Sequence, residues 1–421
     1  MKTLKNIARK YNSVSLILRI ACGLVIGTIL GLAVPGATGI GLLGDLFVGA
    51  LKAVAPVLVF VLVISALAQG MTRLDSRFGT VLWLYIISTL LASVVAVTGS
   101  FLFPQTLKLT ESAQADVIPT GIGEVLKNLL VNMVANPVGS IVDGKYIGIL
   151  FWAVIFGLAF KKLANETTKQ VLSHVADAVS LSVRWIINLA PFGILGLVFT
   201  NVSTNGLSIF TDYGRLLALL VGCMLAVALI VDPLIAWITL RRNPYPLVFR
   251  CLRESGVTAF FTRSSAANIP VNMELCEKLG LDRDMYSVSI PLGATINMDG
   301  AAITIAVMTL ATAHTIGAVV DIPSALILCF LSTLGACGAS GVAGGSLLLI
   351  PMACSLFGIP QDIAMQVVGV GFIIGVVQDS VETALNSSGD VMFAATAEYK
   401  QWIKEGRELP TFLGGKQKVD I

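Results

Sequence analysis

Long stretches of apolar residues recur along this chain of 421 residues. Residues 80–103 include no charged side chain, and a helix needs roughly 20 mostly apolar residues to cross a bilayer. Because lipid offers the backbone no hydrogen-bond partner, each such stretch must be a helix or part of a closed barrel. The apolar runs are continuous rather than alternating, which predicts an all-α polytopic membrane protein. Further candidate spans lie at residues 16–34, 146–160, 186–199 and 216–240.

Composition and charge support the same prediction. Hydrophobic residues make up 56% of the chain and charged residues 13%, against about 25% charged residues in soluble domains. The formal net charge of +3 is too small to indicate nucleic-acid binding. Basic residues mark the cytoplasmic side of a membrane protein, and they cluster at both ends of this chain, so we expect cytoplasmic termini. The clusters are Lys2, Lys5, Arg9 and Lys10, and Lys400, Lys404, Arg407, Lys416 and Lys418.

Two stretches do not fit a simple span. Residues 322–361 carry no charge and are about twice the length of one span, and their glycine-rich centre at 335–346 makes a poor helix interior. We expect a helical hairpin whose tip lies at membrane depth; two ordinary spans joined by a flexible loop are the alternative. Residues 257–271 are too short and too polar for a span and lie between basic patches, which indicates a second hairpin that enters from the cytoplasm. Opposed hairpins are typical of the inverted repeats of secondary transporters.

Polar residues interrupt a long apolar segment at Asn297, Asp299 and Gly300. A charge in the hydrocarbon core costs at least about 2.5–3.5 kcal/mol, so such residues are rarely accidental. An unwound helix at this point would free carbonyl oxygens to bind a hard cation. A hydrogen-bonded kink without a cation is the alternative.

A second polar cluster lies at residues 378–390. Asp379, Glu382, Thr383, Asn386 and Asp390 have the spacing that brings side chains to one face of a helix. Three carboxylates on one face of an intramembrane helix require cations or protons nearby. A helix end in water, carrying a solvated polar stripe, is the alternative.

These features together indicate an ion-coupled transporter. A channel would not need so many different polar groups near two hairpin tips. An intramembrane aspartyl-type hydrolase would need a pair of aspartates, which Asp299 and Asp379 could form. No nucleotide-binding motif is present, so we expect neither a nucleotide nor ATP-driven transport.

Four motifs resemble those of the dicarboxylate/amino acid:cation symporter family. They are Thr262-Arg263-Ser264-Ser265, residues 292–300, Gly341-Val342 with Gly344, and residues 379–390. The likeness covers nearly the whole chain, and the run from Gly293 to Gly300 is highly specific. Within the family the chain is most similar to the bacterial serine/threonine:sodium symporters.

The resemblance implies eight transmembrane helices plus two re-entrant helical hairpins, arranged as an inverted-repeat elevator transporter. The implied protein is a homotrimer in the lipid bilayer of a bacterial inner membrane. Its scaffold would be residues 14–70 and 121–205, and its mobile transport region residues 79–103 and 213–395. The transport region would include hairpins near 247–279 and 322–360, with a cytoplasmic tail at 396–421.

The resemblance also implies a set of substrate-binding residues. Ser265 and Asn386 would hold the substrate carboxylate together with backbone N–H groups, since helix N-termini favour anions. Asp379 would bind the substrate ammonium, and Thr383 and the carbonyl oxygens of Arg263 and Val342 would assist it. Ser264 and Glu382 are the remaining members of the implied set of substrate-binding residues.

Na⁺ is the implied co-transported ion, at three sites built mainly from oxygen atoms. One site would use Asp390 with the carbonyls of Gly293, Asn297 and Asn386. A second would use the carbonyls of Thr295, Ala336, Cys337 and Ala339. A third would use Asp299, the Asn297 side chain, Ser88, Thr89 and Tyr85.

Two departures from the family pattern bear on the substrate. Family members that carry acidic substrates have an arginine where this chain has Glu382, and a threonine where it has Ala301. Those residues grip the side-chain carboxylate of the substrate, which a glutamate would repel. We therefore expect a small neutral substrate, either serine and threonine or another small residue such as alanine. Arg263 would pair with Glu382 or Asp379, which lowers the cost of burying these carboxylates.

Overall fold

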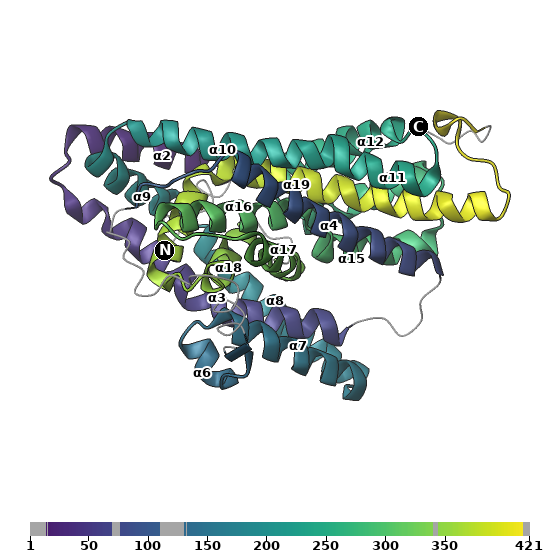
Figure 1. Ribbon diagram of the computed structural model, residues 1–421, viewed down its shortest axis with the longest axis horizontal. Helices are drawn as coiled ribbons and strands as arrows, with labels where there is room; N and C mark the ends of the chain where they lie inside the picture. Colours follow the sequence, from purple (N-terminus) through teal and green to yellow (C-terminus); the bar gives the residue numbers. More distant parts are fainter. Residues whose placement is uncertain are drawn as a thin grey trace, which may run out of the picture.

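The computed structural model describes residue 14 and residues 16–69, 76–109, 130–131, 133–339 and 344–415. The regular elements within these ranges are helices, as the continuous apolar runs predict. The longest, α19 (Gln361–Lys404), lies against α4 (Ser76–Leu102) and against α10 (Ser208–Ala226) and α11 (Asp232–Leu240) (Figure 1). A π-helical turn at Val227–Val231 joins α10 to α11.

A second group of helices comes from the first half of the chain. Gly23 and Gly27 lie so close to the backbone carbonyls of Pro191 and Leu195 that an added methyl group would collide with them. Small residues at such positions let membrane helices pack closely. One helix pair in the group bends by 51° just before Pro191. The helices are α2 (Leu16–Ala33), α3 (Leu42–Ala68), α6 (Pro137–Val142), α7 (Tyr146–Leu163), α8 (Glu166–Ile187) and α9 (Ala190–Asn205).

The predicted break in the helix near Asn297 is present. α15 (Arg283–Ile296) ends there, and α16 (Asp299–Thr315) begins after two residues with non-helical backbone angles, Asn297 and Met298. α16 is buried from Asp299 to Ala313, as expected for a helix that is apolar on every side. The break therefore lies in the interior of the protein.

Both stretches predicted as hairpins fold as helix pairs. In the first hairpin (residues 245–278), the chain reverses at Arg263, whose φ of 51° is left-handed. In the second hairpin (residues 322–355), residues 340–343 lie outside the described part of the chain. Entry from opposite sides of a membrane stays a prediction for both. Their elements are α12 (Tyr245–Cys251), η3 (Leu252–Gly256), α13 (Val257–Thr262) and α14 (Ser265–Lys278), and α17 (Ile322–Ala336), η4 (Ser346–Leu349) and α18 (Ile350–Ser355).

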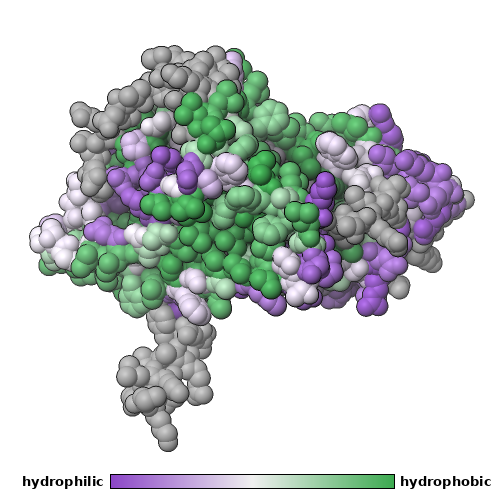
Figure 2. Space-filling model, turned by 90° about the horizontal axis from the view of Figure 1, so that it is seen from below, coloured by the Kyte–Doolittle hydropathy of each residue, from purple (hydrophilic) through white to green (hydrophobic). Residues whose placement is uncertain are grey.

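In the described residues, six helices are long and apolar enough to cross a membrane, or seven if the bent pair α8–α9 is one span. Many of their outward side chains are apolar, and Trp83 and Leu102 are 66% and 68% exposed. Figure 2 shows apolar residues over the middle of one face and hydrophilic residues gathered most densely at one end. An exposed apolar surface of this extent belongs in a bilayer. The protein is therefore a polytopic membrane protein, and the total of eight spans stays a prediction.

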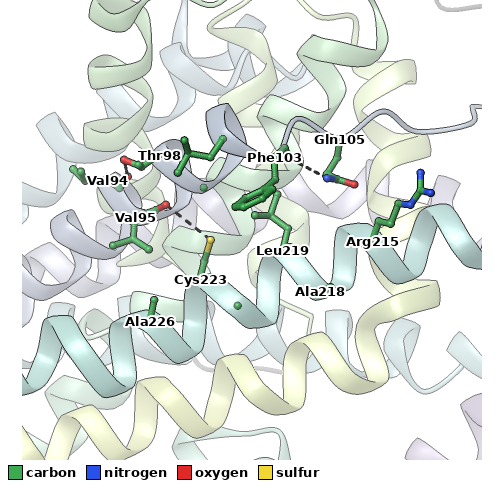
Figure 3. Close-up of a pocket in the computed structure, with 13 residues that line it drawn as sticks. Val94, Val95, Thr98, Phe103, Gln105, Arg215, Ala218, Leu219, Cys223 and Ala226 are labelled. Atoms are coloured by element: carbon green, nitrogen blue, oxygen red, sulfur yellow. Dashed lines mark hydrogen bonds between the residues drawn. The ribbon is translucent and has the colours of Figure 1, made fainter.

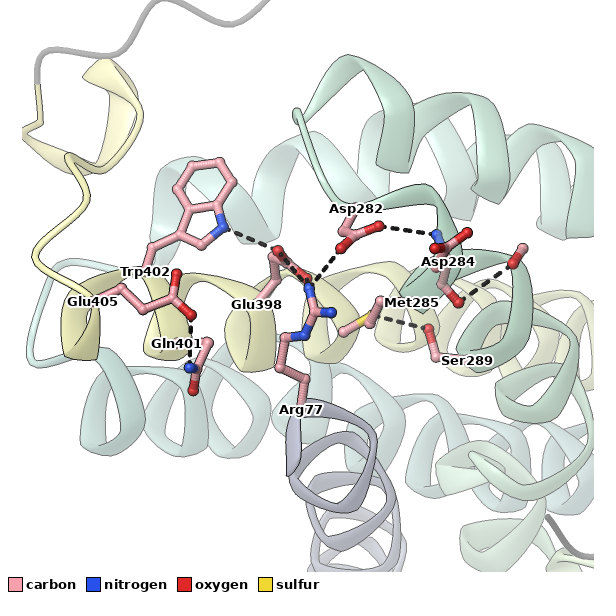
Figure 4. Close-up of polar contacts among 10 residues, drawn as sticks. Arg77, Asp282, Asp284, Met285, Ser289, Glu398, Gln401, Trp402 and Glu405 are labelled. Carbon is pink, nitrogen blue, oxygen red and sulfur yellow. Dashed lines mark hydrogen bonds and ion pairs between the residues drawn. The ribbon is translucent and has the colours of Figure 1, made fainter. Parts of the chain in front are cut away.

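A partly buried ionic network fixes the starts of α4 and α15 against the end of α19 (Figure 4). Arg77 donates to Asp282 at 2.8 Å and to both carboxylate oxygens of Glu398 at 3.3 Å. Trp402 donates to the same glutamate at 2.9 Å. Because α4 carries Tyr85, this network positions that helix relative to α15 and α19.

Candidate functional site

The polar face of α19 meets the first hairpin tip, the break between α15 and α16, and the start of η4. The five residues predicted to share this face, Asp379, Glu382, Thr383, Asn386 and Asp390, are each at most 5% exposed. α19 continues beyond them to Lys404, and its last turns are also largely buried. The alternative of a solvated stripe at a helix end is therefore wrong.

Asp379 accepts hydrogen bonds from both hairpins. Arg263, at the tip of the first hairpin, donates through Nε to Oδ2 of Asp379 at 2.7 Å. The backbone N–H of Gly344, in the second hairpin, donates to Oδ1 at 3.2 Å. The sequence predicted that Arg263 pairs with either Asp379 or Glu382. In the structure it pairs with Asp379. Asp379 is thus a buried carboxylate that already holds a cationic group.

Glu382 lies one helical turn further along α19 and has a different set of partners. Its Oε2 accepts hydrogen bonds from Thr304 at 2.7 Å, Ser346 at 2.9 Å and Gln378 at 2.5 Å. These donors come from α16, η4 and α19, so the carboxylate links three elements. The bonds fix its orientation and satisfy one of its two oxygens.

Asn386 connects α19 to the helix break. Its Oδ1 accepts a hydrogen bond from the backbone N–H of Gly300 at 2.7 Å, and its Nδ2 lies 3.4 Å from the sulfur of Met298. Gly300 itself lies so close to α19 that an added Cβ would come within 2.8 Å of the Cα of Glu382. Thr383 donates its hydroxyl proton to the backbone carbonyl of Asp379 at 2.7 Å.

Gly300→Ala is expected to lower the stability of the purified protein, because the methyl group would push α16 away from the backbone of α19. Overpacking of this kind costs about 1–3 kcal/mol. Gly375→Ala is the matched control, since Gly375 is also buried and helical but a methyl group added there would have no atom within 4 Å. Thermal unfolding should show a lower midpoint for Gly300→Ala only. Equal midpoints for the two variants would contradict the close helix approach.

Asp390 and Asn297 form a group with unused oxygen atoms. The amide Nδ2 of Asn297 donates to Oδ1 of Asp390 at 3.0 Å and to the backbone carbonyl of Asn386 at 3.2 Å. In the described part of the chain, Oδ2 of Asp390 and Oδ1 of Asn297 are buried without a hydrogen-bond partner. Gly293 is also adjacent, because a Cβ there would lie 2.6 Å from the Asp390 carboxylate. Buried oxygens without donors are the arrangement that a hard cation requires.

Asp299 lies in a third cluster, at the start of α16. Thr89 donates to its Oδ1 at 2.8 Å, and Ser88 donates to its Oδ2. The Ser88 hydroxyl also lies 2.9 Å from Oδ1 of Asp232. A hydroxyl has one proton, so it can donate to only one of these carboxylates at a time. Tyr85, one turn before Thr89, has its hydroxyl 3.1 Å from the backbone carbonyl of Asp390, so it contacts the neighbouring cluster instead.

The remaining predicted cation ligands lie at the end of α15 and around the end of α17. Cys337 lies with its sulfur 3.6 Å from the backbone carbonyl of Ile296, which brings the two elements together. Thr295 donates its hydroxyl proton to the carbonyl of Leu292 at 2.7 Å. The carbonyl of Ala336 accepts a hydrogen bond from the N–H of Ala339 at 2.9 Å, within the turn that follows α17.

The first hairpin tip presents the start of a helix. Ser265 is the first residue of α14 and is 2% exposed, and Ser264 caps that helix by accepting a hydrogen bond from the N–H of Ala267 at 3.2 Å. Free N–H groups at a helix start favour an anion. Val342, the other predicted tip residue, lies outside the described residues.

Several polar residues of the site were not predicted. Asp232 was visible in the sequence only as a charge inside an apolar run, which is itself a signal for function. Thr304 and Ser346 hold Glu382, but single polar residues in apolar segments give a weak pattern. Gln378 lies in the predicted polar cluster at 378–390, but no role was predicted for it. A further buried network joins α14 to α19, in which Asn268 donates to the Ser387 hydroxyl at 2.8 Å and Asn272 to the Ser387 carbonyl at 3.1 Å.

Comparison with known proteins identifies the family. A family model described as the sodium:dicarboxylate symporter family matches residues 16–399, which include all the clusters above. The chain belongs to this family. It is therefore a member of a transporter family rather than of an enzyme family.

Three similar proteins are each named serine/threonine transporter SstT. The protein of Bifidobacterium adolescentis is 67% identical over 417 residues, which cover 99% of this chain and 97% of that protein. The protein of Streptococcus agalactiae serotype III is 59% identical, covering 94% of this chain and 98% of its own length. The protein of Streptococcus thermophilus strain LMG 18311 is 57% identical, covering 95% of this chain and 100% of its own length.

Proposed function

We propose that this symporter takes up serine and threonine together with Na⁺ across a bacterial inner membrane. Its family membership supports the coupling to a cation, and the names of its relatives support the substrate. The observation that carries the proposal is the pair of carboxylates on α19, Asp379 and Glu382, both buried beside the hairpins. One suits the ammonium group common to all amino acids, and the other disfavours an acidic side chain.

The substrate ammonium would take the position that the Arg263 guanidinium holds at Asp379. Both groups are cations that donate hydrogen bonds, so the exchange leaves the carboxylate paired. Arg263 has a buried Nη1 without a partner in the described part of the chain. Once displaced, it would lie near the tip where Ser264 and Ser265 begin α14. We infer that Ser265, Asn386 and the helix start hold the substrate carboxylate, with Thr383 beside the ammonium.

Glu382 would set the selectivity for small neutral side chains. Its three hydrogen-bond donors keep it from turning away from an incoming carboxylate. A like charge placed beside it in a desolvated site costs several kcal/mol. Ala301, which is fully buried on α16, offers no hydroxyl to a substrate carboxylate.

Glu382→Gln is expected to relax the exclusion of aspartate while keeping part of the serine uptake. Glutamine has nearly the same shape but no charge, so the concentration of aspartate that inhibits serine uptake should fall at least about tenfold. Glu274→Gln, at an exposed position on α14, is the control and should leave inhibition unchanged. If Glu382→Gln transports serine and aspartate stays a poor inhibitor, Glu382 does not select the substrate. In the same assay with the wild type, the inhibition of labelled serine uptake by unlabelled serine, threonine and alanine is compared. The comparison distinguishes serine and threonine from another small amino acid as the substrate.

Na⁺ would occupy the three predicted groups of oxygens. Asp390 with the carbonyls of Gly293, Asn297 and Asn386 forms the first, and its unpartnered Oδ2 supports this assignment. Backbone carbonyls at Thr295, Ala336, Cys337 and Ala339 would form the second. Asp299 with Ser88, Thr89 and the Asn297 side chain would form the third. Tyr85 was also predicted for the third group, but its hydroxyl lies 3.1 Å from the backbone carbonyl of Asp390 instead.

The transport cycle that we propose is an elevator in a homotrimer. Residues 14–70 and 121–205 would form the fixed scaffold, and residues 79–103 and 213–395 would move with both hairpins. Eight spans and two re-entrant hairpins, with both termini in the cytoplasm, are the proposed topology. The intramembrane hydrolase is not proposed further, because Asp299 and Asp379 have separate partners and the family is one of transporters.

A further inference from the structure

A cleft of about 700 Å³ runs between α4 and α10 (Figure 3), and no residue of the polar clusters of α19 lines it. Most of its lining is apolar, including Val94, Val95 and Leu102 on α4 and Leu219 and Ala226 on α10. Both helices belong to segments long enough to cross a membrane. The cleft therefore lies within the apolar layer, where its occupant must itself be largely apolar.

Two glycines give the cleft its depth. Gly222 on α10 is exposed, and a Cβ added there would meet no atom within 4 Å, so its missing side chain leaves open space. A Cβ on Gly99 of α4 would lie 2.7 Å from the sulfur of Cys223, so this glycine lets the two helices approach each other beside the cleft. The volume falls within the range of about 300–1,000 Å³ that is usual for small-ligand sites.

One end of the cleft carries a positive charge. Figure 3 shows Arg215 beside Gln105 at this end, with Phe103 and Leu219 next along the cleft. Arg215 is exposed and forms no ion pair with a carboxylate in the described part of the chain, whereas the nearby Lys108 is paired with Asp212 at 3.2 Å. A guanidinium suits a phosphate group, which it binds through two parallel hydrogen bonds.

We propose that this cleft binds one acyl chain of an anionic phospholipid, whose phosphate contacts Arg215. The cleft is mostly apolar and has a cation at one end of a spanning segment. It therefore matches both the acyl chain and the anionic headgroup of such a molecule. The apolar part contributes to binding in proportion to the methylene groups that it buries. The site is independent of the proposed function, since none of its lining residues belongs to the substrate or cation groups.

The test is lipid binding to the purified full chain, measured by native mass spectrometry. Phosphatidylglycerol and phosphatidylcholine with identical acyl chains are added separately. The wild type should bind phosphatidylglycerol about tenfold more tightly, because the choline ammonium of phosphatidylcholine offsets the charge of its phosphate and weakens the contact with Arg215. Arg215→Gln should abolish this preference and keep acyl-chain binding. Glycerol phosphate, which lacks the chains, should not displace the lipid.

Gly222→Leu should weaken the binding of both lipids, because its side chain fills the cleft. Gly214→Leu is the matched control, since Gly214 is on the same helix, also has no atom near its Cβ position, and does not line the cleft. Unchanged lipid binding by Gly222→Leu would overturn the proposal, as would a phosphatidylglycerol preference that survives Arg215→Gln. A change in oligomeric state of Gly222→Leu with normal lipid binding would assign the cleft to a protein interface instead.

Discussion

Asp379→Asn should lower the affinity for serine by about tenfold to a hundredfold or more, because it removes the charge that balances the substrate ammonium. Hydrogen bonds to charged groups contribute about 1.5–3 kcal/mol, and each 1.4 kcal/mol corresponds to a factor of ten. The variant also leaves Arg263 buried without its carboxylate partner, which lies at 2.7 Å in the wild type. Breaking one side of a buried ion pair costs about 3–5 kcal/mol of stability.

A double-variant comparison separates the loss of binding from the loss of stability. Arg263→Gln and the double variant Arg263→Gln/Asp379→Asn are measured beside Asp379→Asn, each for unfolding midpoint and for serine affinity. Stability should recover in the double variant, because no unpaired charge remains buried, while serine affinity should stay low. If serine affinity recovers together with stability, Asp379 acts on the fold and does not bind the substrate.

Asp299→Asn and Asp390→Asn should each raise the Na⁺ concentration needed for half-maximal serine uptake by about tenfold or more. The reason is that each substitution removes a negative charge from a buried cation site. Asp299 accepts hydrogen bonds from Ser88 and Thr89, and Asp390 has one buried oxygen without a partner. Serine affinity at saturating Na⁺ should change less in Asp390→Asn, because this residue is remote from Asp379 along α19.

Asp284→Asn is the control for the two cation variants. Asp284 lies in the first turn of α15 and is exposed, so its removal should leave the Na⁺ dependence unchanged. The expected pattern is a shift in Asp299→Asn and in Asp390→Asn, and none in Asp284→Asn. A Na⁺ dependence like that of the wild type in both site variants would refute the assignment of these carboxylates to Na⁺.

The parts of the site that sequence predicted are those with a strong local pattern. The spacing of Asp379 to Asp390 requires only a regular helix, and α19 provides it. The break at Asn297 follows from polar residues and a glycine inside an apolar segment, and the backbone leaves the helical region there. The glycines around residue 340 likewise predicted that one long apolar stretch would be divided into two helices.

The parts that sequence could not predict depend on contacts between distant segments. Ser346 and Thr304 reach Glu382 from two other helices, and neither belongs to a polar cluster of its own. Asp232 is brought to Ser88 by the packing of α11 against α4, which no local spacing encodes. The choice of Asp379 over Glu382 as the partner of Arg263 also depends on the left-handed turn at the hairpin tip.

Accumulation of labelled serine by liposomes that contain the purified protein tests the central claim most directly. The proposed symport predicts uptake above equilibrium when Na⁺ is higher outside than inside, and none when K⁺ replaces Na⁺ at equal ionic strength. Threonine in excess should suppress the uptake, and protein-free liposomes should show none. Equal accumulation under a K⁺ gradient, or under a proton gradient without Na⁺, would contradict sodium-coupled serine transport.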